Sequence, residues 1–149
     1  MTTTPKEYDF GPPTERILEI SGRIARHINR ARQIAATSEF PDYRHGAVLV
    51  RGGSVINVST NKDNFCSFGS RFRNEQSGVA TVHAELGCIL GIDKRKTEGT
   101  TLYVVRVGKA GELKLSKPCP MCYAALKHAG IKKVVFSLDS HTCGSYKIK

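Results

Sequence analysis

The stretches Thr81-Val82-His83-Ala84-Glu85 and Lys117-Pro118-Cys119-Pro120-Met121-Cys122 carry the most specific chemistry of this 149-residue chain. The first offers an imidazole and, two positions on, a carboxylate. The second offers two thiols at the C-x-x-C spacing that suits tetrahedral zinc. A structural zinc has four protein ligands, whereas a catalytic zinc has three and leaves one position for water. The two stretches supply three candidate ligands and so predict a catalytic zinc site. The candidate metal ligands are His83, Cys119 and Cys122.

Glu85 is the candidate catalytic residue, because a carboxylate beside a metal-bound water can take its proton and pass it to a leaving group. If His83 and Glu85 lie in the first turn of a helix, both side chains lean toward its N-terminus. Cys119 and Cys122, at i and i+3, share one face of a second helix start. We therefore expect two helix N-termini to meet at the metal, where their positive ends favour thiolates.

His83-Ala84-Glu85 followed by Pro118-Cys119-Pro120-Met121-Cys122 resembles the zinc-dependent cytidine and deoxycytidylate deaminase superfamily, whose signature is H-x-E followed by P-C-x-x-C. The resemblance covers about residues 14–137. It implies a zinc cofactor and an α/β fold, a three-layer α/β/α sandwich with a mixed central sheet. It also implies hydrolysis at C4 of a cytosine ring, which releases ammonia and leaves uracil, with Glu85 moving the protons.

The resemblance and the residue chemistry together suggest a substrate-binding set. By the resemblance, Asn61 holds a sugar hydroxyl, and backbone groups around Ala47 and Ala84 line the base pocket. Three cations near the first motif suit a 5′-phosphate, because guanidinium and ammonium groups pair well with phosphate oxygens. These cations are Lys62, Arg71 and Arg73.

Composition indicates one domain, residues 14–149, preceded by a flexible arm over residues 1–13 that is polar and contains prolines. No stretch approaches the ~20 apolar residues that cross a bilayer, so no membrane partner is expected. The first residues lack a secretory signal pattern, and we expect a soluble, cytoplasmic protein. The formal net charge of +10 favours phosphate-bearing partners.

Hydrophobic periodicity predicts helix, hairpin, helix, strand, helix, strand, an order typical of a mixed sheet covered by helices. A long polar segment over residues 62–80 has the length of a binding loop. The expected ranges are a helix over 14–35, hairpin strands at 47–50 and 55–58, a helix over 83–92, a strand over 101–107, a helix over 119–129, a strand over 132–137 and a short strand at 145–148.

The sequence is compatible with three functions. The leading one is a deaminase of a free pyrimidine nucleotide or nucleoside. The second acts on cytosine or adenine within single-stranded DNA or RNA, because the same zinc chemistry serves C4 of one base and C6 of the other. The third is a non-enzymatic, zinc-stabilised binding domain, in which Cys143 or His128 completes four ligands. The resemblance also implies a homo-oligomer.

Overall fold

The computed structural model describes residues 15–40, 43–65 and 81–148. Its main sheet has seven strands in the order β1-β9-β8-β6-β2-β3, with β7 paired to β6 off this path. The strands are β1 Arg16–Glu19, β2 Arg44–Arg51, β3 Ser54–Thr60, β4 Lys62–Phe65, β5 Thr81–Val82, β6 Thr101–Val107, β7 Leu113–Lys114, β8 Lys133–Ser137 and β9 Thr142–Lys147. The helices are α2 Gly22–Ala35, α4 Ala84–Ile89, α5 Lys94–Thr97 and α6 Pro120–His128.

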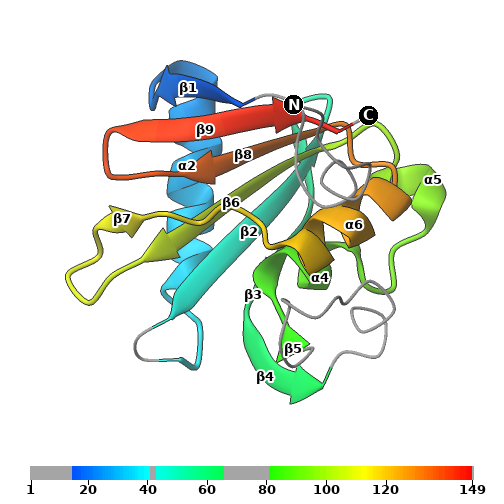
Figure 1. Ribbon diagram of the computed structural model, residues 1–149, viewed down its shortest axis with the longest axis horizontal. Helices are drawn as coiled ribbons and strands as arrows, with labels where there is room; N and C mark the ends of the chain where they lie inside the picture. The colour runs from blue at the N-terminus through cyan, green and yellow to red at the C-terminus, as the bar shows by residue number, and fades with distance from the viewer. Residues whose placement is uncertain (1–14, 41–42, 66–80, 149) are drawn as a thin grey trace, which may run out of the picture.

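Helices cover both faces of the sheet (Figure 1). Helix α2 packs on one face, over a core that includes Val48, Val105 and Val135. Helices α4 and α6 pack on the other face, over a core that includes Leu49 and Val104. Neighbouring strand residues thus alternate between two apolar cores, as expected for a sheet buried on both sides. The expected three-layer α/β/α sandwich is confirmed.

The centre of the sheet agrees with the hydrophobic pattern. Strands β2 and β3 form the expected antiparallel hairpin, and β2 also pairs antiparallel with β6. Gly52 and Gly53 connect the hairpin with φ of +57° and +86°, the left-handed region that two-residue hairpin turns require. Strand β8 pairs parallel with β6, and α6 lies between them in sequence. This β6-α6-β8 unit carries the second metal motif.

The prediction of a helix over residues 14–35 is wrong for residues 16–19. Residues 16–19 form strand β1, which pairs antiparallel with β9 at the sheet edge. Helix α2 begins only at Gly22, which has φ of +56° and so separates strand from helix. The isoleucines of this segment fit helical spacing, but a partner strand about 120 residues away decides the conformation of residues 16–19.

Three other ranges differ from expectation. The segment called a polar loop begins with β4, which pairs with β5 directly before the first metal motif. Helix α4 ends at Ile89, before Gly91 with φ of +74°, and is shorter than the expected range of 83–92. The C-terminal strand is longer than expected, because β9 bonds to β8 on one side and β1 on the other.

Gly46 on β2 lies directly against helix α2, and we expect Gly46→Ala to lower the free energy of unfolding by about 1–3 kcal/mol. A methyl group there would clash with the carbonyl oxygen of Ala31 and lie 2.5 Å from the amide nitrogen of Ala35. Both are backbone atoms, so no side chain can move aside. Urea unfolding measures the effect, with Ser54→Ala at the exposed hairpin as control. Equal midpoints for the two variants would contradict the packing argument.

Among the described residues, no helix is both long enough and apolar enough to cross a bilayer.

Candidate active site

His83, Cys119 and Cys122 come together although 36 residues separate the first two in sequence. Their ligand atoms all lie within 4.8 Å of one another. His83 Nδ1 is 3.1 Å from Cys122 Sγ and 3.9 Å from Cys119 Sγ. Tetrahedral zinc with bonds of about 2.0–2.3 Å needs ligand atoms about 3.5–3.8 Å apart, so small adjustments suffice. The donor set and its spacing both fit zinc.

Helix ends position the ligands. His83 is the N-cap of α4 and Cys119 is the N-cap of α6, each in an extended conformation. Neither side chain makes a capping hydrogen bond to its own helix, so both remain available as ligands. Cys122 follows one turn into α6 and is fully buried. The expectation that the two helix starts meet is met, except that His83 precedes the first turn instead of lying in it.

No fourth ligand joins this group among the residues of the described ranges. Cys143, one alternative from the sequence, is buried in the core beneath α2, on the opposite face of the sheet. His128, the other alternative, lies at the far end of α6 from Cys119. Three ligands are the number that leaves a coordination position open.

The two thiols have opposite electrostatic surroundings. A hydrogen bond from Cys122 is the main cause that lowers the pKa of Cys119 to about 4, although burial opposes it. The same bond and burial hold the pKa of Cys122 well above its usual value. A hydrogen bond with Cys119 raises the pKa of His83. Cys119 is therefore the thiol that ionises more readily, and metal binding also requires the proton of Cys122 to be released, because ligands bind deprotonated.

Glu85 lies in the first turn of α4, two residues after His83, and is only 5% exposed. Burial is the main cause that raises its pKa. A buried carboxyl group of raised pKa that faces a cavity has the properties expected of a proton carrier.

A cavity of about 370 Å³ opens in front of this cluster. Ala84, Glu85 and two of the three candidate ligands contribute to its wall, so a molecule held there would meet both the metal position and the carboxyl group. The lining residues are Phe40, Tyr43, His45, Asn61, Lys62, His83, Ala84, Glu85, Ser116, Lys117 and Cys119.

Asn61 lines this cavity, but protein groups already engage its amide. Its Oδ1 accepts hydrogen bonds from Ser38 Oγ at 2.7 Å and from the backbone N–H of His45 at 3.0 Å. Its Nδ2 donates to the carbonyl oxygen of Tyr43 at 2.5 Å. Asn61 therefore ties two wall segments together, and its contact with a sugar stays a prediction.

The other predicted substrate contacts divide into three groups. Ala84 and the exposed Lys62 line the cavity. Ala47 is fully buried in the core on the same face of the sheet and is not part of the lining. Arg71 and Arg73 lie outside the described residues. Binding of substrate by all five stays a prediction.

Several lining residues were not predicted from the sequence. His45 lies on β2, and burial together with Arg106 lowers its pKa to about 4, so it is neutral at pH 7. Ser116 is buried, and its Oγ donates to the carbonyl oxygen of Val104. Lys117 forms an ion pair with Glu15. Pairing of β2 with β6 positions His45, whereas Ser116 and Lys117 lie in the segment that leads from β7 to Cys119. The sequence therefore has no local signal for these residues apart from the neighbourhood of Lys117 to Cys119.

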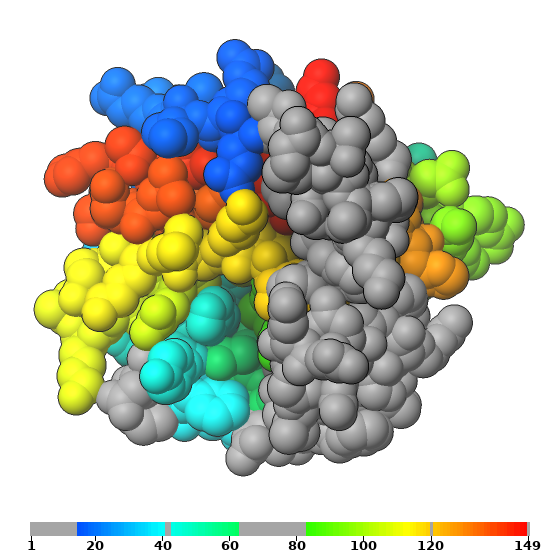
Figure 2. Space-filling view, in the orientation of Figure 1, coloured from blue at the N-terminus to red at the C-terminus, as the bar shows by residue number. Residues whose placement is uncertain are grey.

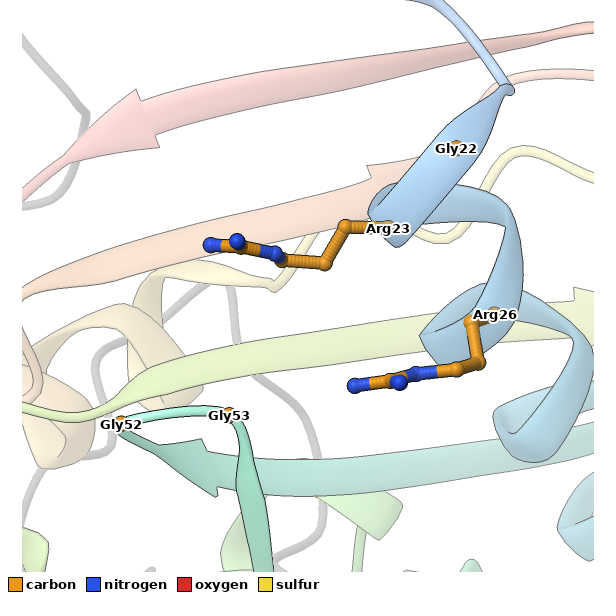
Figure 3. Close-up of a pocket in the computed structure, with 5 residues that line it drawn as sticks. All are labelled: Gly22, Arg23, Arg26, Gly52 and Gly53. Atoms are coloured by element: carbon orange, nitrogen blue, oxygen red, sulfur yellow. The ribbon is translucent and has the colours of Figure 1, made fainter.

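A second cavity, of about 500 Å³, lies beside helix α2 (Figure 3). Arg23 and Arg26 extend from the helix in the direction of the glycine turn at residues 52–53. It is larger than the cavity at the metal cluster, but its lining offers neither a metal ligand nor a carboxyl group. The chemistry therefore belongs to the smaller cavity.

The fold and the cluster define a zinc-binding α/β/α protein with an open coordination position. The family profile of the cytidine and deoxycytidylate deaminase zinc-binding region matches residues 22–138. The chain thus belongs to the cytidine and deoxycytidylate deaminase family, and zinc is the cofactor of this site. No curated protein sequence matches the chain significantly.

The chain is also similar to solved structures. The apo crystal structure of dCMP deaminase from the cyanophage S-TIM5 superposes with a TM-score of 0.53 at 20% identity, over 76% of this chain and 81% of that one. The structure of that deaminase in complex with dCMP and dUMP superposes with a TM-score of 0.46 at 21% identity, over 75% of this chain and 78% of that one. Acinetobacter baumannii RibD superposes with a TM-score of 0.49 at 19% identity, over 78% of this chain and 28% of that one.

Proposed function

We propose that this chain is a zinc-dependent hydrolase that converts a cytosine base to uracil in a free pyrimidine nucleotide or nucleoside and releases ammonia. The observation that carries the proposal is the cavity in which His83, Cys119 and the buried Glu85 share one wall. A domain that only used zinc for stability would need a fourth ligand and would have no use for a buried carboxyl group beside it.

The proposed roles follow from this geometry. His83, Cys119 and Cys122 hold the zinc, which when bound supplies a Lewis acid that makes water a nucleophile at neutral pH. Glu85 lines the same cavity two residues after His83, and its carboxylate would receive a proton there and donate it to the ring nitrogen and the departing amine.

The size and lining of the cavity support a small substrate. Ligand pockets of about 300 Å³ and more hold small molecules, and 370 Å³ falls in this range. Phe40, Tyr43 and His45 add ring surfaces to the wall, and such rings can pack against a base. Lys62 adds a positive charge at the wall. Recognition by Asn61, Ala47, Ala84, Lys62, Arg71 and Arg73 remains part of the proposal, as does a role in pyrimidine nucleotide metabolism.

Ammonia release from a panel of compounds tests the function. We expect the zinc-loaded protein to release ammonia from cytidine, deoxycytidine or their 5′-monophosphates, and not from adenosine or guanine compounds. The free compounds and a cytosine-bearing single strand are offered at equal base concentration. Activity on the strand alone would replace the proposal with nucleic-acid deamination. If the zinc-loaded protein releases ammonia from none of the compounds, the result would favour a binding domain. Cytoplasmic location and assembly into a homo-oligomer stay predictions.

A further inference from the structure

Tyr146 carries a buried hydroxyl group that the proposed mechanism does not use. The residue lies on β9, between β1 and β8 at the edge of the sheet that Figure 2 shows in blue, orange and red. Its side chain is 2% exposed and belongs to the core under α4 and α6. Within the described ranges, its hydroxyl oxygen is buried and has no hydrogen-bond partner. A buried polar group without a partner costs stability, so the hydroxyl group calls for a reason other than packing.

The packing of Tyr146 uses its ring and not its hydroxyl group. The ring centroid is 5.8 Å from that of Phe136 and 5.8 Å from that of Tyr123. Both contacts are made by ring surfaces, so phenylalanine at this position would make the same ones. Gly144, also on β9, leaves the space for the Phe136 ring, with which a Cβ atom there would clash. These contacts fix the Tyr146 ring and with it the position of the hydroxyl group.

The hydroxyl group of Tyr146 lies within electrostatic reach of the metal site. Tyr123, whose ring contacts that of Tyr146, directly follows the candidate ligand Cys122 on α6. Burial is the main cause that raises the pKa of Tyr146, and the charges of Glu85 and Cys122 are among those that raise it further. The phenol is therefore neutral and presents an O–H donor to these two groups. Tyr146 does not line the cavity, so any contact with Glu85 is made from the protein interior.

Glu85 has use for such a donor when zinc is bound. Burial raises the pKa of Glu85, and in the metal-free protein a hydrogen bond from Cys122 opposes this effect. Cys122 cannot donate this bond as a zinc ligand, because a coordinating thiol is deprotonated. The unpartnered O–H of Tyr146 is a donor that can turn to a new acceptor without breaking another hydrogen bond.

We propose that Tyr146 is a positioning residue, whose O–H donates a hydrogen bond to the Glu85 carboxylate in the zinc-loaded protein and so fixes its orientation toward the cavity. The inference rests on the proposed function and adds to it a residue outside both metal motifs. A carboxylate that moves protons between water and a ring nitrogen has to keep one orientation, and hydrogen bonds from a surrounding shell of residues fix it. Metal binding thus gives the buried hydroxyl group the partner that it lacks without metal.

Tyr146→Phe tests the proposal because it removes only the hydroxyl group. We expect kcat to fall by about 10- to 100-fold on the compound that the wild type deaminates fastest, the effect of losing one hydrogen bond to a charged group. KM and the zinc content should not change, since Tyr146 belongs neither to the cavity lining nor to the ligand cluster. Tyr103→Phe, at a buried tyrosine in the core beneath α2, is the matched control and should keep the wild-type kcat.

Thermal unfolding gives a readout that needs no turnover. Without zinc, Tyr146→Phe should unfold at the wild-type temperature or above it, because the buried hydroxyl group has no partner in that state. Added zinc should raise the unfolding temperature less in Tyr146→Phe than in the wild type or in Tyr103→Phe, because only the loaded protein uses the bond. A lower unfolding temperature without zinc, with an equal response to zinc, would show that Tyr146 only supports the packing and would overturn the inference.

The proposed function and the positioning role of Tyr146 fail in different ways. A wild-type protein that releases no ammonia, but responds to zinc more strongly than Tyr146→Phe, would refute the proposed function alone. An active wild type whose Tyr146→Phe variant has an unchanged kcat and the same response to zinc would refute the positioning role alone.

Discussion

Replacing Glu85 by glutamine is expected to reduce ammonia release by about 10²- to 10⁴-fold, the usual contribution of a positioned acid–base group. Glutamine has nearly the same shape and fits the buried site at the start of α4. It cannot accept or return a proton at the cavity wall. The zinc content, measured by atomic absorption, should equal that of the wild type, because Glu85 does not belong to the His83 cluster.

Stability should not fall in this variant. Burial raises the pKa of Glu85, so the ionised carboxylate is disfavoured in the folded protein, and its ionisation at neutral pH costs free energy that a neutral amide avoids. Glu19→Gln, at an exposed position of β1, controls for loss of charge. Retained activity in Glu85→Gln would falsify the proton-transfer role, and loss of zinc together with activity would make Glu85 part of the metal site instead.

Replacing Cys122 by serine should have the second large effect, the loss of bound zinc and of zinc-dependent stability. A ligand that binds only the folded state adds stability that reaches about 2.7 kcal/mol at a concentration 100 times Kd. Cys122 Sγ lies 3.1 Å from His83 Nδ1 and is buried, so its replacement removes one of the three candidate ligands from inside the site. Serine binds zinc poorly because its hydroxyl does not ionise as a thiol does.

Thermal unfolding with and without added zinc measures this effect, and atomic absorption gives the zinc content. Cys143→Ser is the matched control, because Cys143 is an equally buried free thiol in the other core. We expect zinc to raise the unfolding temperature of the wild type and of Cys143→Ser, and to leave Cys122→Ser unchanged. If zinc stabilises all three proteins equally, the metal binds elsewhere.

The metal site was predictable because its information is local. The spacings of His83 to Glu85 and of Cys119 to Cys122 place each pair on one helix start, whatever the rest of the fold. Strand β6 and the β2–β3 hairpin were also predictable, because continuous β-branched runs and a Gly-Gly turn are strong short-range signals.

Strand β1 and the edge of the sheet were not predictable in this way. Residues 16–19 continue the apolar spacing of α2, and only their pairing with β9 makes them a strand. The same holds for β4, whose polar sequence is typical of a loop and whose pairing with β5 makes it a strand. Strand propensity depends on neighbours, and these neighbours are remote in sequence.

The sequence by itself predicted the candidate zinc ligands, Glu85 as the candidate proton carrier, and the family, because each prediction depends on motifs whose residues lie a few positions apart. Only the tertiary structure decided what surrounds them. Pairing of β2 with β6 places His45, a residue of the cavity lining, opposite Arg106, although about 60 residues separate the two in sequence. Such convergence leaves no periodicity in the sequence, because the register of strand pairing is set by packing across the whole sheet.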